Sequence, residues 1–184
     1  MFLLRHGQSF FNLHFTETRR DPGIEDPELT ALGHGQARAA VEELAGAGIT
    51  RVIVSPYVRA LQTVQPFLAL PGVTVEVMHE VRERTAFTCD IGTAPALLAA
   101  RFPQYEFGHL PERWWHEETE SEAEVVARAD AFRAAMRQRD DEHTTLLVSH
   151  WGFILALTGI SVGNGEWVEF HPAGARPGRM NWQH

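Results

Sequence analysis

Two short apolar segments near opposite ends of the sequence each lead directly into a histidine that is closely followed by a glycine. Residues 1–4 (MFLL) precede residues 5–7 (RHG), and residues 145–149 (TLLVS) precede residues 150–152 (HWG). Continuous apolar runs of this length are typical of strands buried on both faces, as in parallel sheets. Ligands of such sheets bind beyond the carboxyl ends of the strands. The pattern therefore predicts two imidazoles that face one crevice.

Length and composition favour one globular domain covering residues 1–184. The hydrophobic fraction is 44% and the charged fraction 22%, which is typical of a soluble protein with a sizeable core. No apolar run approaches the roughly 18 residues that a membrane span needs. The first strand begins at the N-terminus, so we expect no signal peptide. Cys89 is the single cysteine, which predicts no internal disulfide and a cytoplasmic location.

The charged residues exclude several classes of function. The formal net charge is −8, which argues against nucleic acid as a partner. All 16 basic residues are arginine, so Schiff-base, P-loop and Ser-Lys chemistry lack their lysine. The C-x-x-C and H-E-x-x-H zinc patterns are absent from the sequence. We therefore expect neither a metal nor a cofactor, and no membrane partner.

The rest of the chain alternates between helix and strand signals. We expect an irregular stretch over residues 12–28, whose turn signals are D-P-G and D-P. Further strands are predicted at 51–54, 73–77 and 166–170, and helices at 29–45, from 57, at 93–101, from 121 and at 153–158. Predicted helix caps are Thr30, Ser55 (with Pro56 at the first helical position) and Ser121, while Pro66 should end or kink its helix. Core stripes are predicted for Leu29, Leu32, Ala37, Val41 and Leu44, and for Tyr57, Leu61, Val64 and Leu68.

Aromatic residues cluster in two places, and the sequence leaves their role open. Phe10, Phe11 and Phe15 follow the first histidine, and Trp114 and Trp115 lie in a segment rich in proline, glycine and aromatics. All five could belong to the core, as large aromatics often do. Alternatively they could wall the crevice, with the tryptophan segment as its cover.

Five ordered motifs together resemble the histidine phosphatase (phosphoglycerate mutase-like) superfamily, in which a histidine is transiently phosphorylated. They are R-H-G-x-S-x-x-N over 5–12, D-P-x-L-T-x-x-G-x-x-Q-A over 26–37, S-P-x-x-R-A-x-Q-T over 55–63, a glutamate after the third strand, and S-H-W-G-F over 149–153. The resemblance covers nearly the whole chain. It implies a single three-layer α/β/α domain, with a mostly parallel central sheet and an antiparallel edge strand.

The resemblance also implies roles for six residues, five of which belong to the matched motifs and are given first. His6 is the expected nucleophile. Arg5, Arg59 and His150 are the expected phosphate pocket, and Asn12 matches a position that contacts phosphate. Arginine suits this task because its guanidinium presents donors matched to phosphate oxygens.

The general acid and base is the least constrained of these roles. Members of the superfamily carry it on a glutamate just after the third strand. Glu83 is the better match and Glu80 is the alternative. The tryptophan-glutamate-glycine form of the motif is missing, and residues 89–92 (CDIG) occupy the region instead.

The expected function is hydrolysis of small phosphorylated metabolites by a metal-independent, acid-type phosphatase that works through a phosphohistidine. The main alternative is phosphoglycerate mutase-type phosphoryl transfer, although the mutases that the chain resembles are longer, with inserted basic segments. A non-catalytic phosphate-binding module is the third reading. The expected partner is a small phosphate ester, and the protein is expected to be a monomer or a homodimer.

Overall fold

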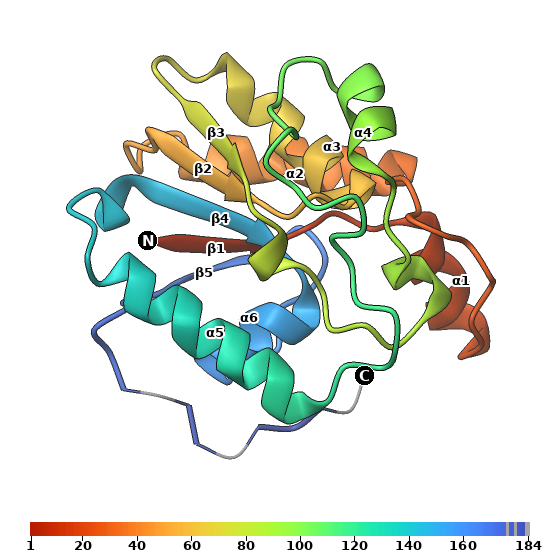
Figure 1. Ribbon diagram of the computed structural model, residues 1–184. Helices are drawn as coiled ribbons and strands as arrows, with labels where there is room; N and C mark the ends of the chain where they lie inside the picture. The colour runs from red at the N-terminus through yellow and green to blue at the C-terminus, as the bar shows by residue number, and fades with distance from the viewer. Residues whose placement is uncertain (176, 179, 183–184) are drawn as a thin grey trace.

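A five-stranded sheet forms the centre of the molecule, in the strand order β3-β2-β4-β1-β5 (Figure 1). The computed structural model describes residues 1–175, 177–178 and 180–182. Neighbouring strands from β3 to β1 are parallel, and β5 pairs antiparallel with β1 at one edge. The strands are β1 (Phe2–Arg5), β2 (Arg51–Val54), β3 (Thr74–Val77), β4 (Thr145–Ser149) and β5 (Trp167–Glu169). The predicted sheet type is confirmed.

Helices cover both faces of this sheet (Figure 1). The α-helices are α1 (Phe10–Thr18), α2 (Ala31–Leu44), α3 (Val58–Val64), α4 (Pro95–Arg101), α5 (Glu122–Met136) and α6 (Trp151–Thr158). The 3₁₀ helices are η1 (Gln65–Ala69), η2 (His79–Val81), η3 (Thr88–Asp90) and η4 (Glu142–Thr144). Alternate strand residues point to opposite faces: Leu4 and Val148 pack with α2, α3 and α4, whereas Leu3 and Leu147 pack with α5 and α6. The fold is therefore the expected three-layer α/β/α arrangement.

The register of β1 and β4 brings the two histidines to one edge. Arg5 lies opposite Ser149 in this parallel pair, and the backbone N–H of His6 donates to the carbonyl of Ser149 over 3.0 Å. His6 and His150 therefore leave the sheet side by side. Helix α1 lies beyond the same carboxyl edge (Figure 1).

The expectation of an irregular stretch over residues 12–28 is wrong for its first part, because α1 runs from Phe10 to Thr18. Ser9 starts this helix through a reciprocal capping box with Asn12. Asn12 Oδ1 accepts from the Ser9 N–H over 3.0 Å, and the Asn12 N–H donates to Ser9 Oγ over 3.3 Å. Glutamate and glutamine are the usual residues at the third position of this box, so an asparagine there gave no signal.

Ser55 does not cap α3, contrary to the sequence-based expectation. The helix begins at Val58, whose N–H donates to Asp26 Oδ1 over 2.9 Å. The Ser55 hydroxyl is instead 2.7 Å from Nε2 of His150. A carboxylate distant in the sequence thus caps the helix, and the serine is left to contact a histidine.

Other helix signals are confirmed, with two exceptions in the core stripes. Thr30 caps α2, Ser121 and Glu124 form a capping box on α5, and α3 gives way to η1 next to Pro66. Leu32 is exposed because α2 buries the neighbouring row through Gly33, Ala37, Ala40 and Leu44. Leu68 is exposed because it lies in η1, where a 3₁₀ helix has 3.0 residues per turn and loses the α-helical spacing.

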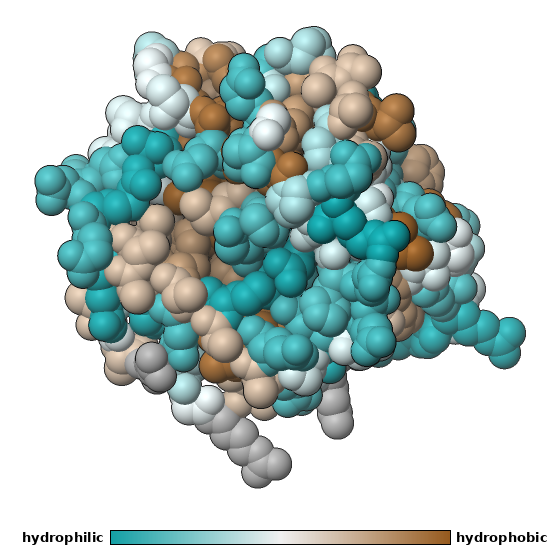
Figure 2. Space-filling model, viewed as in Figure 1, coloured by the Kyte–Doolittle hydropathy of each residue, from teal (hydrophilic) through white to brown (hydrophobic). Residues whose placement is uncertain are grey.

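The outer surface mixes polar and apolar residues. Figure 2 shows hydrophilic residues over most of the viewed face, with hydrophobic residues in scattered groups. Every helix in the described ranges is too short or too polar to cross a bilayer.

Two glycines let the segment after β1 lie directly against the start of α2. A Cβ at Gly7 would overlap the backbone of Gly33, and a Cβ at Gly33 would overlap the carbonyl of Gln8. The contact is held by the Thr30 N–H, which donates to the Gln8 carbonyl over 2.9 Å. This backbone contact fixes the position of the segment that carries His6.

Gly33→Ala should therefore destabilise the protein, by about 1–3 kcal/mol as expected for overpacking. Gly35→Ala, in the same helix, is the matched control. A Cβ at Gly35 would find its nearest neighbour, the Arg38 side chain, at 4.0 Å, and alanine favours a helix over glycine by about 0.5–1 kcal/mol. Urea unfolding of both variants tests this. Equal stability of the two would contradict the backbone contact.

Candidate active site

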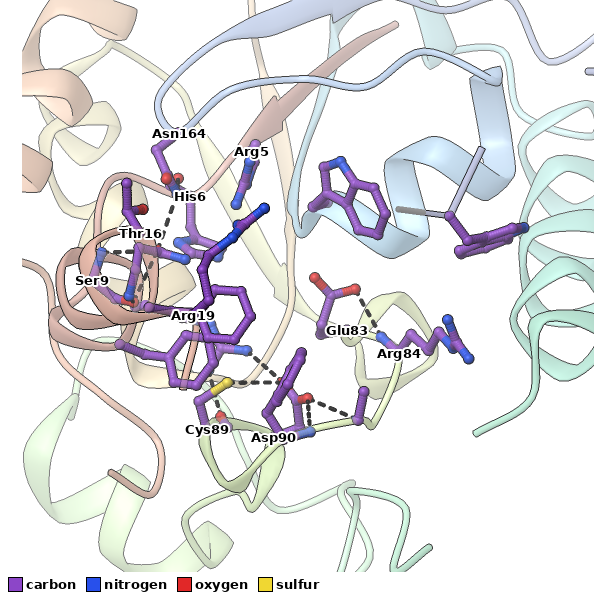
Figure 3. Close-up of a pocket in the computed structure, with 18 residues that line it drawn as sticks. Arg5, His6, Ser9, Thr16, Arg19, Glu83, Arg84, Cys89, Asp90 and Asn164 are labelled. Atoms are coloured by element: carbon purple, nitrogen blue, oxygen red, sulfur yellow. Dashed lines mark hydrogen bonds and ion pairs between the residues drawn. The ribbon is translucent and has the colours of Figure 1, made fainter. Parts of the chain in front are cut away.

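A cavity of about 410 Å³ opens at the carboxyl edge of the sheet, beside α1 (Figure 3). Five of the six residues expected from the sequence line it: Arg5, His6, Asn12, Arg59 and Glu83. His150 is fully buried next to His6, with the two ring centroids 5.0 Å apart. The structure therefore brings all six residues together.

The His6 ring is held in one tautomer by the backbone. Its Nδ1 is 2.7 Å from the carbonyl oxygen of Gly7, and a carbonyl only accepts hydrogen bonds. Nδ1 therefore carries the proton of the neutral ring, and Nε2 keeps its lone pair. Burial, then the nearby cations of Arg59 and Arg5, hold the pKa of His6 well below its usual value. The arrangement gives a neutral imidazole with one free basic nitrogen.

His150 is also held neutral. Its pKa is lowered well below the usual value by burial first, and then by Arg59 and by His6. Its Nε2 contacts the Ser55 hydroxyl at 2.7 Å, whereas its buried Nδ1 finds no hydrogen-bond partner among the described residues. An unpartnered buried polar atom costs free energy, and His150 lies behind His6, outside the residues that line the cavity.

Arg5 is oriented by a backbone group outside the cavity lining. Arg5 donates from Nη1 to the Val162 carbonyl over 2.9 Å, and its Nε is buried without a partner among the described residues. Burial lowers the pKa of Arg5 to about 10, so the side chain stays cationic at neutral pH.

Arg59 is nearly fully buried and is held on three sides. Nη1 donates to the carbonyl of Cys89 over 2.8 Å, and Nη2 donates to Asp90 Oδ1 over 3.1 Å. The guanidinium also lies 4.2 Å from the ring centroid of Tyr57, within the range of a cation–π contact. These contacts fix a cation in the cavity wall.

Glu83 and Glu80 lie in different environments. Glu83 lines the cavity, where Oε1 accepts from the N–H groups of Arg84 (2.8 Å) and Gly152 (2.9 Å). Burial, and then the negative charge of Asp90, raise the pKa of Glu83 to about 7. The Glu80 side chain is 56% exposed and pairs with His79, outside the cavity lining. Of the two candidates, only Glu83 therefore faces the cavity.

The backbone that carries Glu83 is clamped by Arg128 from α5. Its guanidinium donates to the carbonyls of Glu80 (2.6 Å), Arg82 (3.2 Å) and Glu83 (3.4 Å). The buried carboxylate of Glu120 holds Arg128 through two oxygens, at 2.6 and 2.7 Å. This bidentate pair is geometrically specific, so it fixes the segment after β3 in one position.

Asn12 has a fully engaged carbonyl oxygen. Oδ1 accepts from the backbone N–H and hydroxyl of Ser9 and from Nδ2 of Asn164, at 3.0, 2.9 and 3.2 Å. The amide group is therefore fixed in orientation, with its NH₂ left for other partners.

Sequence reasoning missed several residues that orient the site. Asp90 is the most important of them: it contacts Arg59 through Oδ1, and through Oδ2 it accepts from the N–H groups of Ala86 and Phe87 at 3.0 and 3.1 Å. Residues 89–92 stand where a different motif was expected, which was the only signal available. Ser55 carried only the signature of a helix cap, and the pair Glu120 and Arg128 gave no signal that could be read without the fold.

The structure also settles which aromatic residues face the cavity. Phe11 and Phe15 line it, whereas Phe10 does not. Trp114 is buried in the core, where its ring packs on Tyr57 and its Nε1 donates to the Thr93 carbonyl. Trp115 packs against the same core, so the tryptophan pair does not cover the cavity. Phe87, Trp151 and Trp182, which the sequence did not suggest, are the other aromatic residues of the lining.

Metal ligation has no support in the described part of the chain, where no group of three or more histidine, cysteine or carboxylate side chains is arranged to hold an ion. The positive charge of the cavity comes instead from guanidinium groups.

Comparison with known sequences points to one family. A family model described as the histidine phosphatase superfamily (branch 1) matches residues 1–175. The chain is 38% identical over 65 residues to a probable phosphoglycerate mutase GpmB of Proteus mirabilis, covering 35% of this chain and 28% of that protein. The protein of the same name from Yersinia enterocolitica is 32% identical over 83 residues, covering 45% and 37%. The chain thus matches well under half the length of these relatives.

Solved structures share the fold over most of the chain. A mycobacterial glucosyl-3-phosphoglycerate phosphatase, solved as a complex with VO₃, has a TM-score of 0.65 and 26% identity, covering 91% of this chain and 88% of that one. A phosphoserine phosphatase from Entamoeba histolytica, solved with 3-phosphoglyceric acid, has a TM-score of 0.60 and 22% identity, covering 90% of this chain and 87% of that one.

Proposed function

The chain belongs to the histidine phosphatase superfamily, and from this membership we propose that it hydrolyses small phosphate monoesters through a phosphohistidine on His6. One observation carries the proposal. A buried, neutral imidazole has Nδ1 tied to the Gly7 carbonyl and lies beside Arg5 and Arg59 in the lining of a cavity. A lone pair next to two cations suits attack on a phosphoryl group.

Arg5, Arg59, His150 and Asn12 bind the phosphoryl oxygens in this proposal. Phosphoryl transfer needs chiefly positioning and electrostatic stabilisation, which the two guanidiniums supply without a metal ion. The buried, unpartnered Nε of Arg5 supports the assignment of Arg5, because a bound phosphate would give this N–H an acceptor.

The proposed reaction has two steps, phosphorylation of His6 and hydrolysis of the phosphohistidine. Nε2 of His6 forms a bond to phosphorus while the ester P–O bond breaks, and the Glu83 carboxyl gives its proton to the departing alkoxide. Water then attacks the phosphohistidine, Glu83 takes back a proton, and inorganic phosphate leaves as His6 becomes neutral. The raised pKa of Glu83, about 7, suits both roles because both protonation states are accessible near neutral pH.

A phosphoglycerate mutase activity is the second candidate, because the curated relatives carry that name. It would use the same histidine but return the phosphoryl group to a sugar acid. Hydrolysis is favoured by the likeness over 91% of this chain to a phosphatase.

We also propose that the protein is one domain that acts in the cytoplasm, since its single cysteine, Cys89, is buried and free.

Phosphate release distinguishes these candidates. We expect inorganic phosphate to be released at the same rate in EDTA, and with or without 2,3-bisphosphoglycerate. His6→Ala should lower this rate at least about a thousandfold, since the nucleophile is removed. His14→Ala is the control, because His14 lies exposed on α1 outside the cavity lining. Interconversion of 2- and 3-phosphoglycerate that outpaces release would identify a mutase, and full turnover by His6→Ala would exclude the proposed nucleophile.

The role of Glu83 predicts a particular pH and leaving-group dependence. For an alkyl phosphate, the single-turnover rate should fall above about pH 7, because Glu83, with its pKa raised to about 7, loses the proton it must donate. The acidic limb should lie well below pH 6.5, since the pKa of His6 is lowered. Glu83→Gln should slow alkyl phosphates about 100- to 10,000-fold.

The same variant should slow 4-nitrophenyl phosphate far less, because nitrophenolate leaves without a proton. Glu80→Gln is the matched control and should change neither rate. Should Glu80→Gln show the leaving-group pattern and Glu83→Gln lack it, the assignment of the acid would be wrong.

A further inference from the structure

We propose that the outer part of the cavity is a binding site for an aromatic ring, so that the preferred substrates are phosphate monoesters of small, ring-bearing alcohols. The inference rests on the proposed function, because it places the ring on the leaving group. Its physical basis is separate, and consists of three phenylalanine side chains that line the cavity together.

Phe11, Phe15 and Phe87 form one continuous aromatic wall. Their ring centroids are 5.3 Å apart for Phe11 and Phe15, 5.4 Å for Phe11 and Phe87, and 5.0 Å for Phe15 and Phe87. Phe11 and Phe15 are one turn apart on α1, and Phe87 comes from the segment before η3. Distances of this size are those of favourable aromatic pairs, so the three rings are fixed against one another.

The wall remains incompletely buried although its members pack together. Phe15 and Phe87 are half-buried, and all three residues line the cavity. Apolar surface that faces water in a concave site is typical of a ligand pocket. A flat ring laid against this wall would bury that surface and add a fourth aromatic contact.

The wall is joined rigidly to the phosphate end of the cavity by Asp90. One oxygen of this carboxylate accepts from Arg59, and the other accepts from the N–H groups of Ala86 and Phe87. The same buried group thus positions a proposed phosphate ligand and one ring of the wall. A ring linked to the phosphoryl group through its ester oxygen would meet both ends at once.

Two further arginines of the lining lie against aromatic rings of the same lining. The guanidinium of Arg19 lies 5.6 Å from the Phe15 ring centroid, and that of Arg84 lies 5.5 Å from the Trp182 ring centroid. Arg84 also donates from Nε to the Glu120 carbonyl over 2.9 Å. Both distances are within the range of a cation–π contact. At about 410 Å³, the cavity limits the ligand to a small molecule.

Matched substrates isolate the ring from the chemistry of the leaving group. Benzyl phosphate and 2-methoxyethyl phosphate have primary alcohols of similar acidity but differ in the ring. We expect kcat/KM to favour benzyl phosphate at least about tenfold. The Phe15→Ala, Phe87→Ala double variant should reduce this ratio to about one to two.

Phe10→Ala is the control, because Phe10 lies on the same helix but outside the cavity lining, and it should keep the wild-type ratio. A Phe15→Leu, Phe87→Leu variant keeps apolar bulk where the alanine pair fails to fold. It should still lose most of the preference, because leucine offers no flat face. A wild-type ratio near one, or a ratio unchanged in both double variants, would overturn the inference.

Binding of non-hydrolysable analogues separates failure of this inference from failure of the proposed function. Calorimetry would compare 2-phenylethylphosphonate with 3-methoxypropylphosphonate, which replace the ester oxygen by a methylene. Tighter binding of the phenyl compound, lost in the double variants, supports the ring site even if no ester is hydrolysed. Hydrolysis without any preference in turnover or binding would leave the proposed function intact and reject the ring site.

Discussion

Arg5 lies opposite Ser149 in the parallel pair of β1 and β4, and the candidate site depends on this register. A shift by one residue would turn every side chain of one strand to the other face. It would separate His6 from His150, whose rings are now 5.0 Å apart. The register is secured because Leu3 and Leu147 pack on one face of the sheet while Leu4 and Val148 pack on the other. Hydrophobic burial on both faces therefore determines where the imidazoles meet.

Burial and the buried charges of the site determine the protonation of its side chains. They keep the two imidazoles neutral and shift the pKa of one carboxyl toward neutral pH. Arg59 is compensated by Asp90 and by the Cys89 carbonyl, which makes a buried cation tolerable. That cation in turn helps to keep His6 neutral. Glu83 has the opposite shift, with a pKa raised to about 7, because it lies in the same buried environment with the negative charge of Asp90 nearby. One arrangement of neighbours thus gives an imidazole that stays neutral and a carboxyl that can hold or lose a proton near pH 7.

The sequence predicted the elements whose signals are local. The buried strands before His6 and His150, the cap at Thr30 and the capping box at Ser121 are confirmed. The contacts that the sequence did not predict are between residues that only the fold brings close together. Ser55 has the sequence signature of a helix cap, yet it contacts His150 from 95 positions away. Asp90 and the aromatic wall of Phe11, Phe15 and Phe87 combine segments whose proximity no spacing rule indicates.

Because Nδ1 of His6 is hydrogen-bonded to the Gly7 carbonyl, the proposed phosphohistidine can be tested at the level of a single atom. The measurement is a rapid quench in alkali with an isotopically labelled ester, followed by phosphorus NMR and peptide mapping of the trapped protein. We expect a phosphoryl group on Nε2 of His6, in a linkage that survives alkali and is lost in acid. A phosphoryl group on Nδ1, on His150 or in an acid-stable linkage would contradict it.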